Sequence, residues 1–175
     1  MTTKRQLARI VILAIFTTLV FFIGRELYYA RSYVQMINPV SVSFDEMVQK
    51  AEVIARGVVT KKIGSYRTIE NGEVMVYTRW QFNVDRVYKG NPGQTIKLKT
   101  AGGRYGLTEV QVEGAPKITP GKEVVIFISK QNGDYIFQFN QGYCDVTQDA
   151  QGGEILVQQL SKEVKTFDDL ISAIK

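Results

Sequence analysis

The sequence predicts a mainly β protein: a small antiparallel barrel with short flanking helices, preceded by a single N-terminal transmembrane helix. Three observations predict this fold. A charge-free apolar run stands close to the N-terminus, short segments of alternating apolar and polar residues follow it, and tight-turn residues separate these segments. We therefore expect a cytoplasmic tail and transmembrane anchor over residues 1–33, a linker over residues 34–42, and one domain of ordinary size over residues 43–175.

The apolar run at residues 10–23 contains neither a charge nor a proline. It is short for a hydrocarbon core of about 30 Å, but its flanks extend the expected helix to about residues 7–29. Arg9 lies inside this span, and its guanidinium can reach the lipid headgroups while its stem stays among the acyl chains. Tyr28 and Tyr29 are typical of the aromatic belt at a membrane interface. The run therefore predicts one membrane-spanning helix.

A cleaved signal peptide is the alternative, because a basic start and a short apolar run suit both. Cleavage after Gly24 would place Phe22 at position −3, and cleavage after Ala30 would place Tyr28 there, so no A-x-A-like site follows the run. No cysteine follows it directly, which excludes a lipoprotein. The sequence therefore favours an uncleaved signal anchor in the cell membrane.

The positive charge of the chain is concentrated at its N-terminus. The chain has 22 Lys and Arg and 17 Asp and Glu, of which residues 1–33 hold five basic and one acidic, leaving 17 and 16 for the remainder. Since Lys4, Arg5 and Arg9 precede the apolar run, the positive-inside rule predicts a cytoplasmic N-terminus and an extracytoplasmic domain. A domain so close to neutral lacks the basic patch of a nucleic-acid-binding protein, so no nucleic-acid partner is expected.

The domain is expected to begin with a short helix and to continue as strands. Ser43 and Glu46 form the S-x-x-E pattern of a helix start. Residues 53–63 predict a strand, in which Gly57 indicates a bend or a close backbone approach. Asn71-Gly72 predicts a tight hairpin. The expected apolar face of the helix comprises Phe44, Met47, Val48 and Ala51.

Residues 74–85 form the clearest strand of the sequence, because apolar and polar residues alternate strictly along them. Trp80 stands on the apolar face and is expected in the core. Tyr77 and Arg79 stand on the other face. The alternation shifts by one residue after Asp85, which indicates a β-bulge.

Turns and short strands continue to the C-terminus. Residues 124–128 are continuously apolar, as expected of a central strand buried on both faces. Thr166 is the expected cap of a final helix. Turn residues are Asn91-Pro92-Gly93, Pro120-Gly121 and Asn132-Gly133. Other strands are predicted at residues 96–99, 109–113, 135–139 and 154–160.

Several motifs of the domain resemble those of a known family. In chain order they are A-x-V-I-x-x-G-x-V at 51–59, V-x-x-V-Y-K-G at 84–90, Gly102-Gly103, V-x-G-A-P at 112–116 and P-G-K-E-V-V-I-F-I at 120–128. The domain resembles bacterial extracytoplasmic OB-like β-barrel domains of unknown function and is similar to the netrin/metalloproteinase-inhibitor-like module. The resemblance covers about residues 43–147 and implies an OB-like barrel. The inhibitor module acts through a disulfide-bonded N-terminal cysteine that contacts a metal ion. This chain has no such cysteine, so the resemblance does not imply that activity.

The residue types of common catalytic sites are sparse. The chain has no histidine, which excludes Ser-His-Asp and Cys-His sites and histidine-bound zinc. The single Cys144 excludes an intrachain disulfide and is expected as a small buried side chain. Glu109 and Glu113 share one strand face at about 13 Å, too far apart for a glycosidase pair. We therefore expect no catalytic residue, no cofactor and no metal.

These observations predict a membrane-anchored, non-catalytic binding or assembly module whose partner is another envelope or surface protein. The expected contact surface is an exposed loop on a rigid barrel, because such loops often carry recognition. Its residues are Gly102, Gly103, Arg104, Tyr105 and Gly106. Two alternatives stay open: a carboxylate-dependent enzyme acting on cell-wall glycan, and, by fold analogy, an inhibitor of an extracellular protease.

Overall fold

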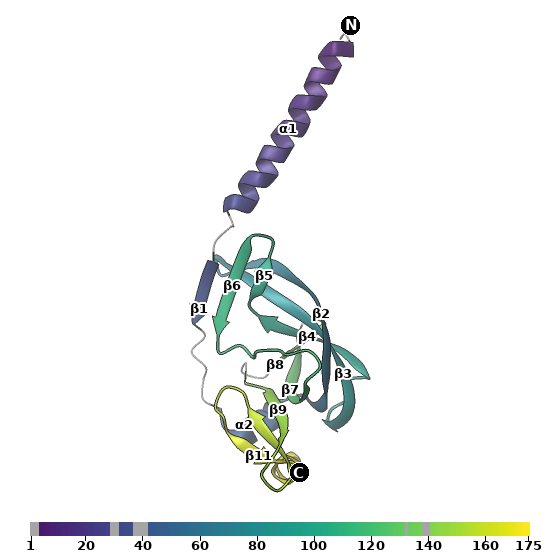
Figure 1. Cartoon of the computed structure of the whole chain (residues 1–175), viewed down its shortest axis with the longest axis vertical. Helices are drawn as coiled ribbons and strands as arrows, with labels where there is room; N and C mark the ends of the chain where they lie inside the picture. Colours follow the sequence, from purple (N-terminus) through teal and green to yellow (C-terminus); the bar gives the residue numbers. More distant parts are fainter. Residues whose placement is uncertain (1–3, 29–31, 37–41, 132, 138–140) are drawn as a thin grey trace.

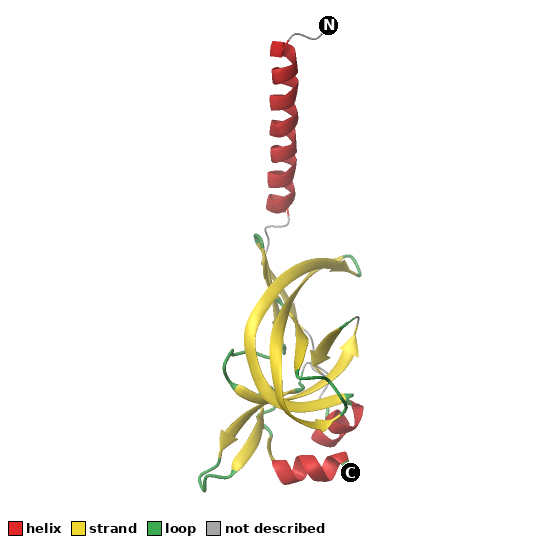
Figure 2. Cartoon of the chain, turned by 90° about the vertical axis from the view of Figure 1, so that its right-hand side faces the viewer, coloured by secondary structure: helices red, strands yellow, loops and turns green. Residues whose placement is uncertain are grey.

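A long N-terminal helix extends away from a β-rich domain in the computed structural model (Figures 1 and 2). The structure describes residues 4–28, 32–36, 42–131, 133–137 and 141–175. The helices are α1 (Lys4–Tyr28), α2 (Phe44–Lys50) and α3 (Phe167–Ile174). The strands are β1 (Ser32–Met36), β2 (Val53–Glu70), β3 (Glu73–Lys89), β4 (Thr95–Ala101), β5 (Gly103–Tyr105), β6 (Thr108–Glu113), β7 (Glu123–Gln131), β8 (Asp134–Phe137), β9 (Tyr143–Gln148), β10 (Glu154–Gln158) and β11 (Val164–Thr166).

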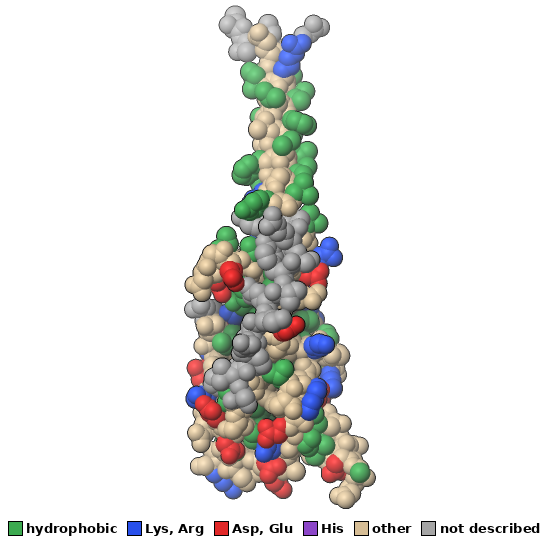
Figure 3. Space-filling view, turned by 90° about the vertical axis from the view of Figure 1, so that its left-hand side faces the viewer, with side chains coloured by type: hydrophobic (Ala, Val, Ile, Leu, Met, Phe, Trp, Pro, Cys, Tyr) green, Lys and Arg blue, Asp and Glu red, His purple; other side chains and the backbone are tan. Residues whose placement is uncertain are grey.

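Among the described residues, α1 is the one helix long and apolar enough to cross a membrane, over Gln6–Tyr28. Apolar side chains cover its surface along most of its length (Figure 3). Thr17 and Thr18 donate their hydroxyls to the carbonyls of Leu13 and Ala14 at 2.8 Å, so these polar groups are satisfied within the helix. A signal sequence near an N-terminus also meets these criteria of length and apolarity, so retention and orientation of the helix stay predictions.

The main sheet has eight strands in the order β11-β10-β9-β7-β2-β3-β4-β8. All neighbours are antiparallel except β4 and β8, which are parallel. β7 also pairs with β8, so the pairing runs from β2 through β3, β4, β8 and β7 back to β2. A second, three-stranded sheet has the order β1-β6-β5. The prediction of a mainly β domain is confirmed.

The long hairpin of β2 and β3 follows the predicted turn and bulges. Asn71 and Gly72 both have positive φ, at 53° and 82°, as a two-residue hairpin turn requires. Near the start of β2 the register shifts twice, so that Asp85 and Tyr88 are left without a partner in the ladder, where the sequence predicted a bulge. A Cβ built on Gly57 would lie 2.0 Å from the carbonyl oxygen of Asn83, which confirms the close backbone approach.

Two hydrophobic clusters lie on opposite faces of β7. Ile126 is fully buried in one cluster together with Phe82 and Leu98. Phe127 is fully buried in the other, which α2 and α3 cover. The prediction that residues 124–128 form a strand buried on both faces is confirmed.

The helices that cover the second cluster begin where the sequence predicted. The hydroxyl of Ser43 accepts the N–H of Glu46 at the start of α2, and the four residues of its predicted apolar face are buried. At the start of α3, Thr166 and Asp169 form a reciprocal capping box. Leu170 of α3 is fully buried in the cluster.

Four strands were not predicted from the sequence: β1, β5, β9 and β11. β1 lies where the anchor and linker were expected to meet and pairs in parallel with β6. β2 also continues to Glu70, beyond its predicted end at residue 63. The predicted turn residue Asn132 and the predicted strand residue Phe139 lie outside the described residues.

Cys144 is expected to resist thiol reagents until the domain unfolds. It is buried as predicted, and burial, with a smaller contribution from the charge of Asp145, raises its pKa to about 12. The thiolate is the reactive form, so the raised pKa slows the reaction of Cys144 at pH 8, and burial slows it further by blocking access of the reagent. Maleimide labelling followed by mass spectrometry should show modification only in denaturant. A Leu160→Cys variant, exposed at that position, serves as the fast control. Labelling of native Cys144 at the control's rate would show that the site is open.

Candidate functional site

The five residues of the predicted contact surface do not form one loop. Gly103–Tyr105 is strand β5, paired with β6, which corrects the prediction of a loop. Gly102 is buried and Gly103 half-buried, whereas Arg104, Tyr105 and Gly106 are exposed. The glycines turn the chain from β4 into β5 with φ of 91° and 127°, and a Cβ on Gly103 would lie 2.2 Å from the hydroxyl of Thr78.

Gly102 and Gly103 line a shallow depression of about 550 Å³. Its other walls are β6 and residues 114–117, the segment that follows β6. The acidic side chains in it are Glu109 and Glu113, both on β6. At a rise of about 3.3 Å per residue, the four residue steps between them correspond to about 13 Å along the strand. Arg104, Tyr105 and Gly106 do not line this depression.

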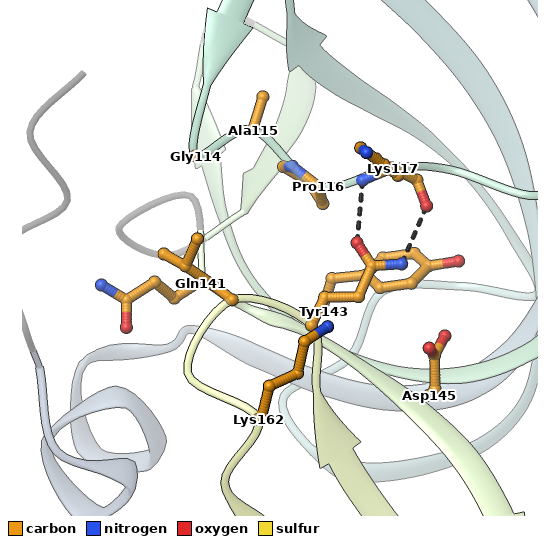
Figure 4. A pocket seen from close by; sticks show the side chains of 10 residues that line it. Gly114, Ala115, Pro116, Lys117, Gln141, Tyr143, Asp145 and Lys162 are labelled. Carbon is orange, nitrogen blue, oxygen red and sulfur yellow. Dashed lines mark hydrogen bonds between the residues drawn. The ribbon is translucent and has the colours of Figure 1, made fainter. Parts of the chain in front are cut away.

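Residues 114–117 also line a second depression, of about 330 Å³ (Figure 4). Its remaining walls come from the start of β9 and from the turn between β10 and β11. They comprise Gln141, Tyr143, Asp145, Gln159, Leu160 and Lys162. The two depressions therefore share one wall, which we call the 114–117 wall. Sequence reasoning missed the second depression, because its residues are far apart in the chain.

The 114–117 wall is held in place by Gln159. The side-chain oxygen of Gln159 accepts the backbone N–H of Lys117 at 2.8 Å, and its side-chain nitrogen donates to the carbonyl of Lys117 at 2.9 Å (Figure 4). One amide group thus satisfies both backbone groups of a residue that lies outside any strand. The depression is therefore preformed.

Two buried oxygens in the lining of this depression receive no hydrogen bond from the described residues. They are the hydroxyl of Tyr143 and Oδ1 of Asp145. Oδ2 of Asp145 pairs with the ammonium of Lys122 at 2.8 Å. Leaving a buried polar group unsatisfied costs about 1–3 kcal/mol. Each of the two oxygens is almost fully shielded from solvent, so neither is open to a ligand that occupies the depression.

The electrostatics of Tyr143 favour its neutral form. Burial, and then the charge of Asp145, raise its pKa to about 12. The backbone N–H of Thr119 acts in the opposite direction on this pKa, but it lies outside hydrogen-bond geometry. Tyr143 therefore carries its proton at neutral pH and does not act as a base.

The polar face of β3 forms a ladder of aromatic rings and cations. Tyr77 stacks on Tyr66 with ring centroids 5.7 Å apart, and its hydroxyl donates to Glu70 at 2.8 Å. The guanidinium of Arg79 lies 4.6 Å from the Tyr66 ring centre and pairs with Asp134 at 2.7 Å, while the ammonium of Lys99 lies 4.8 Å from the Tyr77 ring centre. Each ring already has a cation partner, so the ladder stabilises the sheet.

Trp80 packs against the first cluster, and its indole N–H donates to Thr100 at 3.0 Å, which confirms the predicted core role.

Arg56 of β2 pairs bidentately with Glu123 of β7 and Glu154 of β10, at 2.7–2.9 Å. Its side chain is 17% exposed, so these pairs join three strands of the sheet in a partly shielded network. Among the described residues, no group of three or more His, Cys, Asp or Glu side chains could hold a metal ion.

Fold and site together define a mainly β domain that follows a long apolar helix and carries two adjoining open depressions. No protein-family model and no curated protein matches the chain. The resemblance to extracytoplasmic OB-like domains therefore stays a prediction from the sequence motifs.

Proposed function

We propose that the chain is a membrane-anchored, extracytoplasmic binding module that engages a segment of another envelope protein. In this proposal α1 is retained as the anchor, with its basic N-terminus in the cytoplasm. The domain is an OB-like barrel built from β2, β3, β4, β8 and β7. Support for the barrel comes from the pairing of these five strands, which returns from β7 to β2, since OB-like domains are small five-stranded barrels.

The binding surface of this proposal is the 114–117 wall with the depression on each side of it. Gly114, Ala115 and Pro116 have small side chains, so the backbone of an extended segment can approach this wall closely. The observation that carries the proposal is the fixed position of this wall between two depressions, where the side-chain amide of Gln159 bonds both backbone groups of Lys117.

The glycan-enzyme alternative is less well supported. Glycosidases place their two carboxyl groups about 5–9.5 Å apart, whereas Glu109 and Glu113 are separated by about 13 Å of strand. The protease-inhibitor alternative rests on the resemblance alone. We therefore retain the binding module as the function that the geometry supports best.

Site-specific photocrosslinking in intact cells of the native host tests this function. A photoreactive residue at Gln111 or Lys162 reports on one depression each, and Lys61 and Lys97 are exposed control positions on β2 and β4. We expect one discrete adduct from both depressions and none from the controls.

Gln159→Leu sharpens this test, because it removes the amide group that holds the 114–117 wall and keeps a side chain of similar size. Loss of the two hydrogen bonds that fix the wall should reduce the adduct yield from both depressions about tenfold, the effect of about 1.4 kcal/mol. Adducts that form equally from the control positions, or a yield that Gln159→Leu leaves unchanged, would refute the proposed surface.

A further inference from the structure

The hairpin of β5 and β6 ends in an exposed apolar tip. Gly106 and Leu107 form its turn. Leu107 is 51% exposed and Tyr105 is 43% exposed, although both side chains are largely apolar. Isolated exposed apolar residues are ordinary on protein surfaces, so the location of this pair decides its meaning.

The tip lies beside the last turn of α1. Oε2 of Glu26 lies 3.0 Å from the place where a Cβ on Gly106 would stand, and the guanidinium of Arg67 on β2 lies 3.8 Å from the same carboxylate. Figure 1 shows the hairpin at the end of the domain nearest the helix. The apolar span of α1 ends at Tyr28, two residues after Glu26. The tip therefore stands at the level where the apolar part of the helix ends.

The charges at this end of the domain suit a lipid surface. Glu26 is balanced by Arg25, at 3.4 Å, and by Arg67. Arg67 also lies 5.8 Å from the ring centre of Tyr105 on β5 and donates to Thr108 on β6 at 3.3 Å, so it contacts both strands of the hairpin. The exposed Arg104 donates to the carbonyl of Gly106 at 3.3 Å, which holds a guanidinium beside the tip, where lipid phosphates would lie.

We propose that the β5–β6 tip is a second membrane contact, in which Tyr105 and Leu107 enter the interfacial layer of the bilayer beside the anchor. The proposal rests on the membrane anchor of the proposed function. Tyrosine suits this layer because its ring is apolar and its hydroxyl is polar, and leucine adds apolar area buried among the acyl chains. The partner that contacts the tip is lipid, because Glu26, which lies next to the tip, belongs to the helix that spans the membrane in the proposed function.

The consequence is a fixed tilt of the domain. A helix alone would let the domain rotate about the point where it joins the membrane, whereas a helix and a hairpin tip define two points on the membrane plane. The 114–117 wall, which follows β6 directly, would then face a constant direction relative to the membrane.

Depth-dependent fluorescence quenching of the full chain in lipid vesicles tests the contact. An environment-sensitive fluorophore is attached to Leu107→Cys, to Val164→Cys or to Phe16→Cys, each in a Cys144→Ala background. Val164 is a matched exposed apolar residue on β11, at the end of the domain away from α1 (Figure 1). Phe16 lies within α1 and reports on the anchor. The vesicles contain phosphatidylcholine and phosphatidylglycerol, with a spin label at a shallow or a deep acyl position.

We expect the Leu107 probe to be quenched at least twofold more by the shallow label than the Val164 probe, and more by the shallow than by the deep label. A Leu107 probe quenched no more than the Val164 probe, while the Phe16 probe is strongly quenched, would overturn the tip contact and leave the anchor standing. An unquenched Phe16 probe would overturn the anchor itself and this inference with it.

Discussion

Replacing Gly57 by alanine is expected to destabilise the domain by about 3 kcal/mol or more, at or beyond the upper end of the usual cost of overpacking a core. The added Cβ would lie 2.0 Å from the carbonyl oxygen of Asn83 and 3.0 Å from the ring of Phe82. The oxygen belongs to the backbone of β3 and cannot turn away as a side chain would. The strands must therefore separate where β2 pairs with both β3 and β7.

Gly64→Ala is the matched control for this change, because Gly64 lies on the same strand, has no positive φ, and has nothing within 4 Å of the position that the new methyl group would take. We expect it to be neutral or to stabilise by about 0.4–1 kcal/mol through the unfolded chain. Urea unfolding of both variants, followed by the fluorescence of Trp80, measures the difference. Equal midpoints for the two variants would refute the close contact at Gly57.

Phe127→Ala is expected to cost about 3–5 kcal/mol, a large part of the stability of a typical domain. Phe127 is fully buried, and its ring meets that of Phe44 edge-to-face with centroids 5.7 Å apart. Its removal leaves a cavity between β7 and the covering helices, and the close-packed surroundings can fill it only in part.

Ile69→Ala controls for the loss of apolar side-chain area. Ile69 is 60% exposed near the end of β2, so its truncation should change stability by less than about 0.5 kcal/mol. Thermal unfolding followed by circular dichroism ranks the two variants. If the Phe127→Ala and Ile69→Ala proteins unfolded at the same midpoint temperature, the second cluster would contribute little to stability.

Local signals predicted the elements that depend on neighbouring residues. The Asn71-Gly72 turn, the cap at Ser43 and the alternation of β3 each act within a few residues, and each was confirmed. The apolar run in β7 was equally clear, because a strand covered on both faces has no polar side.

Pairings between distant segments could not be predicted in this way. The parallel contact of β4 with β8 involves two residue pairs, and β1 pairs with a strand more than 70 residues away. The second depression combines residues 114–117 with Tyr143, Asp145 and the turn after β10. Tyr143 is itself a buried residue of the first hydrophobic cluster. The G-A-P sequence at 114–116, an irregular segment after a strand, was the one available signal.

Because both hydrophobic clusters include residues of β7, neither half of the domain is expected to be stable without the other. Alternate side chains of this strand enter the two clusters, so any opening that removes it exposes apolar surface on both sides at once. Partial unfolding that spares one half would leave that half without its central strand. A protease that cut within β7 would therefore leave no independently folded fragment, and the domain would be degraded or retained as a whole.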